Sequence, residues 1–236
     1  MRPSHPPVSK DVVLAAYEEW SRQPEEHRKM MSSRETWENR FDEAIAIIPW
    51  DGVRRWLDVG CGTARFFEKV LASGCAPSLE AVTGVDAIAN NVQAARAKAW
   101  PSSPVVTVRQ WDIEDLHRLD DDPFDLVTMV GVVYQCGLAP AIAVEKCLGC
   151  LGATGTLLIT TENPRCRHFR EHPHGCYPDR DEMERLLVCT GRPPARLIVQ
   201  YTNPLWRQRE IGIAHDASVE FKEMFFLASY AAAAAV

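Results

Sequence analysis

The sequence predicts an α/β protein in which a doubly wound, mainly parallel sheet is covered by helices on both faces. Short apolar segments alternate with helix-like segments from residue 53 onward, and this alternation is typical of parallel strands joined by crossover helices. The apolar segments are also close to continuous, as expected for strands that are buried on both faces. Together these two observations give the fold class.

The composition of the 236 residues suits one soluble domain, with 46% hydrophobic and 25% charged residues. The formal net charge of −6 argues against a sequence-independent grip on nucleic acid, so no nucleic-acid partner is expected. No segment approaches the ~18 apolar residues of a membrane helix, and the first residues lack the apolar core of a secretory signal. The eight cysteines are scattered and suit reduced thiols, so we expect a cytoplasmic protein without membrane contact.

Residues 1–50 are expected to form a helical cap that precedes the sheet. Apolar residues between positions 12 and 20 recur at helical spacing. A second helix opens with Ser32 and Glu35 at the spacing of a capping box, and its apolar stripe runs to Ile48. The sheet-containing domain is expected over residues 51–230, and the low-complexity tail 231–236 is given no function.

The elements of the sheet domain follow in a regular order. Five strands are expected at Trp56–Val59, Val82–Val85, Val105–Val108, Phe124–Val133 and Thr156–Thr160, with helices at Ala64–Ser73, Ala89–Trp100 and Ala141–Leu151. A long loop, residues 163–178, interrupts this rhythm before a helix that Asp179 and Glu182 would cap. Two further strand candidates, Ala195–Tyr201 and Val219–Leu227, would pair antiparallel at a sheet edge.

Acidic residues and glycines stand where the predicted strands end. Asp58, Gly60 and Gly62 follow the first strand, Asp86 closes the second, and Asp112 follows the third. Ligands of doubly wound sheets bind outside the carboxyl ends of the strands. A carboxylate at the end of the second strand can accept from both hydroxyls of a ribose, and Asp112 can accept from the exocyclic amine of adenine.

The glycine turn also discriminates between nucleotide ligands. Ala64 and Arg65 follow it where a dinucleotide-binding turn would have a third glycine. Asp58 beside the turn would repel a pyrophosphate and attract an ammonium group. The pattern therefore indicates an adenosine with a ribose diol, a positive amino group and no phosphate. S-adenosylmethionine has all three features and is the predicted cofactor.

Five ordered motifs resemble those of the class I S-adenosylmethionine-dependent methyltransferases. They are Leu57–Thr63, Gly84–Asp86, Trp111–Ile113, Phe124–Val127 and Leu151–Leu158, within residues 53–162. One glycine-rich turn alone would be a weak signal, whereas five motifs in order are specific. The resemblance implies a Rossmann-like seven-stranded sheet, mostly parallel with an antiparallel last strand. The family often has glycine where Ala64 stands, and Pro-Gly-Gly where this chain has Gly152–Gly155.

The resemblance also implies roles for individual residues. It assigns Asp58, Gly60 and Gly62 to the methionine portion of the cofactor, Asp86 to the ribose, Asp112 and Ile113 to the adenine, and Val130 and Tyr134 to the methyl-transfer face. Cys61 and Ala87 neighbour these residues and complete the predicted cofactor site. Arg40, on the second amino-terminal helix, either reaches the methionine carboxylate or is a surface residue, and both readings stay open.

A general base is expected beyond the carboxyl ends of the fourth and fifth strands, because an oxygen or nitrogen nucleophile benefits from one. The first candidates are His168, His172 and His174 in the loop 163–178, followed by Tyr134 as an orienting hydrogen-bond partner. Cysteines flank these histidines, but their spacing matches no familiar zinc site and interleaved arginines would repel a cation. We therefore expect a substrate-facing loop and no metal.

The predicted function is methyl transfer to the oxygen or nitrogen of a small-molecule acceptor, as in secondary metabolism, by in-line SN2 displacement. The short acidic chain without an appended recognition domain motivates this choice, and a monomer or homodimer is expected. One alternative is a methyltransferase acting on RNA or protein, supported by arginines at positions 165, 167, 170, 180, 207 and 209. Another is a binding protein that has lost the chemistry, against which the intact Asp58, Asp86 and Asp112 speak.

Overall fold

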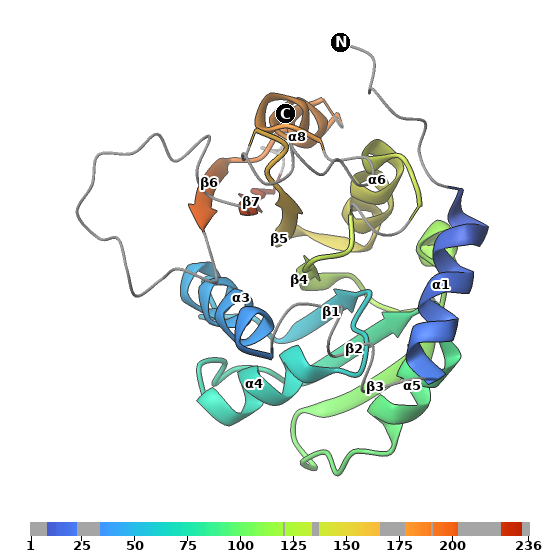
Figure 1. Ribbon diagram of the computed structural model, residues 1–236. Coiled ribbons are helices and arrows are strands. Elements are labelled where there is room, and N and C mark those ends of the chain that lie inside the picture. The colour runs from blue at the N-terminus through green and yellow to red at the C-terminus, as the bar shows by residue number, and fades with distance from the viewer. Residues whose placement is uncertain are drawn as a thin grey trace.

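The computed structural model describes residues 9–22, 34–119, 121–133, 137–165, 178–189, 191–202 and 223–232. Seven strands form one sheet in the order β3-β2-β1-β4-β5-β7-β6 (Figure 1). The strands are β1 (Arg55–Val59), β2 (Ala81–Asp86), β3 (Val105–Gln110), β4 (Phe124–Met129), β5 (Leu151–Glu162), β6 (Arg196–Thr202) and β7 (Glu223–Ser229). β1 to β5 are parallel, and β7 runs antiparallel to both β5 and β6. The predicted doubly wound fold with an antiparallel last strand is confirmed.

Helices cover both faces of this sheet. They are α1 (Lys10–Arg22), α3 (Arg34–Ile47), α4 (Arg65–Ser73), α5 (Ala89–Arg96), the 3-10 helix η1 (Ile113–Arg118), α6 (Pro140–Cys150) and α8 (Arg180–Val188). The helices α3, α4 and α5 share a core with one face, and η1, α6 and α8 share a core with the other (Figure 1). α1 lies beside α5, where the Asn90 amide donates to the Ser21 hydroxyl at 3.0 Å. Within the described ranges, no helix is both long and apolar enough to cross a membrane.

Several element boundaries differ from the sequence-based expectation, and β5 is longer than expected, running from Leu151 to Glu162 where Thr156–Thr160 was expected. β4 ends at Met129 because the backbone turns at Gly131, whose φ is 72°. α5 ends at Arg96, before the expected Trp100. The expected antiparallel pairing of the last two strands at a sheet edge is confirmed, and the inner strand of this pair, next to β5, is β7. Its nearly continuous buried run suits an interior strand, and β6, which contains Arg196 and Gln200, forms the edge.

An aromatic cluster seats α4 against the sheet and so places the turn that follows β1. The ring of Trp56 in β1 meets Phe66 and Phe67 of α4 edge-on, with centroids 5.1 and 5.0 Å apart. Gly84 in β2 permits this approach, because a Cβ there would lie 2.7 Å from Phe67 Cζ and 2.9 Å from Cys61 Sγ. These contacts hold the turn between β1 and α4 close to the carboxyl end of β2.

Candidate functional site

The glycine turn after β1 is tied to the carboxyl end of β2. The backbone amides of Gly60 and Cys61 both donate to the Val85 carbonyl, at 2.8 and 3.0 Å. Gly60 adopts φ 73° and Gly62 adopts φ 55°, conformations that glycine reaches without a steric penalty. A Cβ on Gly60 would lie 2.4 Å from Cγ2 of Val132, so the turn also needs glycine for close packing.

Ala64 adopts a left-handed backbone conformation, which glycine would reach without a steric penalty. Its φ of 59° and ψ of 34° are left-handed, and it precedes the first turn of α4. The Ala64 amide donates to the Cys61 carbonyl at 2.9 Å, which closes the turn. The left-handed region costs a non-glycine residue about 1–2 kcal/mol. The backbone at this position is therefore left-handed although the residue is alanine and not glycine.

Asp86 joins the turn after β1 to the turn after β2. One carboxylate oxygen accepts from the Gly62 amide at 2.8 Å, and the other accepts from the Ile88 amide at 2.9 Å and from Asn91 Nδ2 at 3.3 Å. Burial raises the pKa of Asp86, and these three hydrogen bonds oppose that shift. The carboxylate retains acceptor capacity for the two hydroxyls of a ribose, since its two oxygens offer about four lone-pair sites.

Asp58 is buried at the end of β1 and belongs to a chain of hydrogen bonds. Its Oδ1 accepts from the Thr128 hydroxyl at 2.6 Å, and that hydroxyl oxygen accepts from Trp56 Nε1 at 2.8 Å. Burial raises the pKa of Asp58 to about 7, the Thr128 hydrogen bond opposes the rise, and the charge of Asp86 adds to it. This carboxyl group therefore titrates near neutral pH.

Asp112, predicted at the adenine, is engaged by an amino-terminal lysine. Its Oδ1 accepts from the Glu114 amide at 2.9 Å and so caps η1. Its Oδ2 lies 2.6 Å from Nζ of Lys10, which also pairs with the Glu114 carboxylate. Lys10 is the first residue of α1, and a Cβ on Gly137 would lie 2.5 Å from its Cα. α1 is thus anchored beside the carboxyl end of β3.

Arg40 is not a surface residue, since only 4% of it is exposed. Its Nε donates to both carboxylate oxygens of Glu223, at 2.9 and 2.7 Å, and Nη2 donates to the same carboxylate. Glu223 opens β7 and is the strand partner of Glu162 at the end of β5. The Arg40–Glu223 ion pair therefore lies beside the carboxyl end of β5.

The structure brings the residues predicted for the methionine and ribose portions together at the ends of β1 and β2, and Val130 is buried just after β4. Ile113 opens η1, and the Ala87 carbonyl accepts from Gln110 Nε2 at 3.2 Å. The four candidates for catalysis lie outside the described residues; they are Tyr134, His168, His172 and His174. Sequence reasoning missed Lys10, Thr128 and Glu223, whose partners are distant in the chain.

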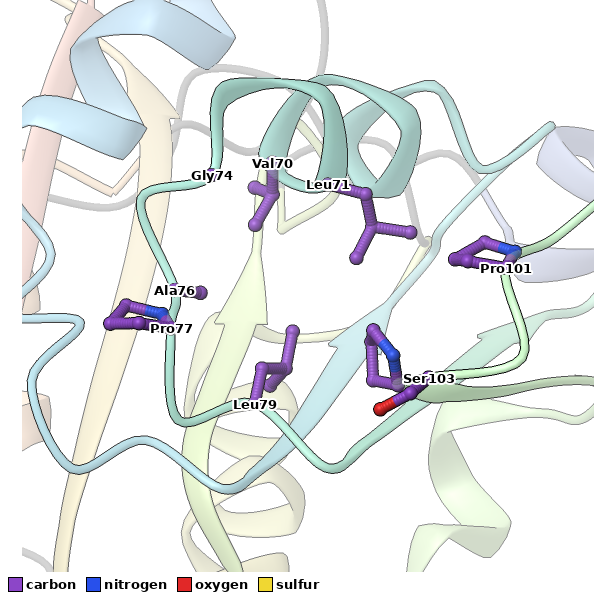
Figure 2. A pocket seen from close by; sticks show the side chains of 9 residues that line it. Val70, Leu71, Gly74, Ala76, Pro77, Leu79, Pro101 and Ser103 are labelled. Carbon is purple, nitrogen blue, oxygen red and sulfur yellow. The ribbon is translucent and has the colours of Figure 1, made fainter.

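A surface pocket of about 290 Å³ lies away from this site. Figure 2 shows that Val70 and Leu71 of α4, Leu79 before β2 and Pro101 before β3 line it. These segments precede the amino ends of the parallel strands, opposite the edge that carries the glycine turn. We therefore leave this pocket out of the cofactor site.

Replacing Asp86 with Asn should weaken cofactor binding by about 1–3 kcal/mol. In the wild type, the backbone amides of Gly62 and Ile88 donate to the carboxylate, whereas the side-chain NH₂ of asparagine would face one of these donors with another donor. Titration calorimetry with S-adenosylhomocysteine measures the loss. Asp51→Asn, an exposed change in the turn before β1, serves as the control and should bind like the wild type. Equal affinity in the two variants would refute the role of Asp86.

Known proteins resemble this chain in sequence and in fold. A family model described as "Methyltransferase domain" matches residues 57–159. The chain is 34% identical over 110 residues to the ubiquinone biosynthesis O-methyltransferase of Alkalilimnicola ehrlichii, covering 47% of this chain and 42% of that protein. The chain thus spans less than half the length of that relative.

Solved structures share the fold at low sequence identity. A chain in the complex between the Haloferax volcanii Trm112 methyltransferase activator and a methyltransferase is 17% identical, with a TM-score of 0.68 over 95% of this chain and 100% of that one. Magnesium protoporphyrin IX methyltransferase from Synechocystis with bound S-adenosylhomocysteine is 14% identical, with a TM-score of 0.63 over 94% and 99%. Residues 57–159 of this chain thus match a methyltransferase domain, and its sheet has the strand order of the α/β methyltransferase fold.

Proposed function

We propose that this protein transfers the methyl group of S-adenosylmethionine to an oxygen or nitrogen of a small-molecule acceptor. The observation that carries the proposal is the convergence of the glycine turn with buried Asp58 and Asp86 at the carboxyl ends of β1 and β2. This arrangement suits a ligand that has both a ribose diol and an ammonium group. The sulfonium activates the methyl group, so the protein mainly aligns the acceptor for in-line displacement.

Two observations favour a small acceptor over RNA or protein. Relatives and structural neighbours are named for ubiquinone biosynthesis and for magnesium protoporphyrin IX, which are small molecules. Of the arginines that would support a macromolecular substrate, Arg165 and Arg180 lie within the described residues. Arg165 is 3.9 Å from Asp181 and Arg180 is 2.5 Å from Glu184, so neighbouring acids offset both charges.

The histidines of the loop 163–178 remain our candidates for the general base, and Tyr134 for an orienting hydrogen bond. We expect alanine at one of His168, His172 and His174 to lower kcat on the order of 10²-fold, the lower range for loss of a general base. Cofactor affinity should stay unchanged, since these residues are assigned to the acceptor. Steady-state kinetics and calorimetry on the three variants separate the two effects, and wild-type kcat in all three would exclude the loop as the source of the base.

The proposed function is tested in two stages on the full chain. Calorimetric titration with S-adenosylmethionine comes first, and failure of well-folded protein to bind it would favour the inactive binding protein. Transfer of a labelled methyl group is then followed with phenols, catechols and amines, and separately with RNA and protein. Label in a small acceptor after complete removal of macromolecules supports the proposal. Label found solely in RNA or protein would overturn it.

A further inference from the structure

Three side chains on β1 and β4 form a continuous buried chain that ends at the cofactor site. Asp58 and Thr128 are register partners on neighbouring parallel strands, and Trp56 precedes Asp58 by two residues on the same face of β1. Trp56 and Thr128 are fully buried, and Asp58 is 3% exposed. The two links measure 2.8 Å from Trp56 Nε1 to Thr128 Oγ1 and 2.6 Å from there to Asp58 Oδ1.

The chemistry of the donors gives this chain a direction. An indole N–H can only donate, so the Thr128 oxygen accepts from Trp56. The single hydroxyl hydrogen of Thr128 is then directed to Asp58 Oδ1. A length of 2.6 Å is in the range of a hydroxyl that donates to a carboxylate. Trp56 thus occupies one acceptor site of the Thr128 oxygen, while the Thr128 hydroxyl donates to Asp58.

This direction decides where Asp58 can carry a proton. While Oδ1 accepts from Thr128, we expect a proton on the carboxyl group to reside on Oδ2. Within the described part of the chain, no group donates a hydrogen bond to Oδ2. Oδ2 is therefore the oxygen that a ligand ammonium would use, and the proton and the ammonium compete for it.

Among the described residues, no cation contributes to the pKa shift of Asp58, and Lys98, which acts on the neighbouring Cys61, is paired with Glu68. Asp86, at the end of β2, is negative and disfavours ionisation of Asp58. Cys61 in the adjacent turn stays a neutral thiol, because burial raises its pKa well above the usual value. Arg40 of α3 is neutralised by Glu223. An ammonium from the cofactor would be the complementary charge.

We propose that Trp56 and Thr128 are positioning residues that hold Asp58 ready for the ammonium group of S-adenosylmethionine, and that cofactor binding displaces a proton from Asp58 to the solvent. The inference rests on the proposed function, since it needs a cofactor with an amino group. It assigns a task to two fully buried side chains that the proposed function leaves without a role.

The pH dependence follows from the pKa of Asp58, which burial raises to about 7. Below that pH the carboxyl group carries a proton that binding must remove, so affinity should fall by up to about tenfold per pH unit. Affinity should rise through pH 7 and level off until the cofactor's own α-amino group loses its proton, near pH 8. In the free protein, the same raised pKa makes this group's contribution to stability decrease between about pH 4 and pH 7, because the unfolded chain releases the proton first.

Calorimetry on the full chain between pH 5.5 and 7.5 tests the inference with two probes. S-adenosylhomocysteine carries the ammonium, and 5′-methylthioadenosine lacks the amino-acid portion. The titrations are repeated in buffers with different ionisation enthalpies, because the change in the observed binding enthalpy between buffers gives the number of protons released. With a pKa of about 7 for Asp58, we expect S-adenosylhomocysteine to bind about fivefold more weakly at pH 6 than at pH 7 and to release close to one proton at pH 6. The affinity of 5′-methylthioadenosine should stay constant.

Variants then identify the positioning residues. Thr128→Val removes the donor at equal volume and should move the midpoint of the S-adenosylhomocysteine profile upward by about one pH unit. Thr128→Ser keeps the hydroxyl and should retain the wild-type midpoint. Trp56→Phe removes the N–H that orients the Thr128 hydroxyl from one side, so a smaller upward shift of the midpoint is expected.

The outcomes separate this inference from the function on which it rests. A wild-type protein that binds neither probe refutes the proposed function. Binding of S-adenosylhomocysteine with a flat pH profile and no proton release refutes the displacement alone. The positioning role would be overturned if Thr128→Val and the wild type had the same midpoint. It would also be overturned if Thr128→Val lost as much affinity for 5′-methylthioadenosine as for S-adenosylhomocysteine. If Thr128→Val does not fold, the pH midpoints of S-adenosylhomocysteine binding in Thr128→Ser and Trp56→Phe decide the positioning role. The same midpoint in these two variants would overturn it.

Discussion

Replacing Glu223 with leucine is expected to lower the free energy of unfolding by about 3–5 kcal/mol, the range for removing one partner of a buried ion pair. The Arg40 guanidinium donates to both oxygens of this carboxylate, and both side chains are buried. The variant would keep the buried positive charge and lose the group that neutralises it. Urea unfolding followed by circular dichroism measures the change.

The matched variant combines Arg40→Met with Glu223→Leu. Apolar replacement of both members of a buried pair is often close to neutral, so the double variant should recover most of the loss. Asp42→Asn is the control on the same helix, because its pair with Lys69 is partly exposed and should contribute less than about 1 kcal/mol. A Glu223→Leu variant as stable as Asp42→Asn would show that the pair is not important for folding.

Replacing Gly60 with alanine should cost about 2–5 kcal/mol of stability and abolish measurable cofactor binding. A φ of 73° costs alanine about 1–2 kcal/mol. The added Cβ would also lie 2.4 and 3.0 Å from the two terminal carbons of Val132, and overpacking of this kind costs about 1–3 kcal/mol. The turn would have to move away from β4, which displaces the neighbouring amide of Cys61. Thermal unfolding and calorimetry with S-adenosylhomocysteine measure the two effects.

Two further variants separate backbone strain from steric overlap. Gly62→Ala has φ 55° and no heavy atom within 4 Å of the added Cβ, so its stability loss should stay near 1–2 kcal/mol. Val132→Ala in the Gly60→Ala background should restore the part that comes from overlap. If Gly60→Ala and Gly62→Ala lose the same stability, contact with Val132 is not the reason for the glycine.

Features that depend on local chemistry could be predicted from the sequence. Alternating apolar segments identified β1 to β5, and the spacing of Asp179 and Glu182 identified the start of α8, where the Asp179 carboxylate accepts from the Glu182 amide at 2.8 Å. The acids Asp58 and Asp86 could be read as a cofactor site because strand ends in such folds meet at one edge.

Features that depend on pairing across the fold could not be predicted in the same way. Thr128 reads as one polar residue in an apolar strand until the register of β1 and β4 places it beside Asp58. Arg40 and Glu223 are 183 positions apart, and nothing in either segment indicates the other. Lys10 likewise reaches Asp112 through the packing of α1, which side-chain spacing does not reveal.

The interior position of β7 has a consequence for how the chain folds during synthesis. Residues 163–222 are translated between β5 and its antiparallel neighbour. Until β7 emerges from the ribosome, β5 therefore presents an open edge, and the segment that pairs with β7, Thr156–Glu162, is buried in the finished sheet except for Glu162. Open apolar edges pair readily with other chains. A nascent chain stalled before residue 223 should consequently depend on chaperones far more than the completed protein does.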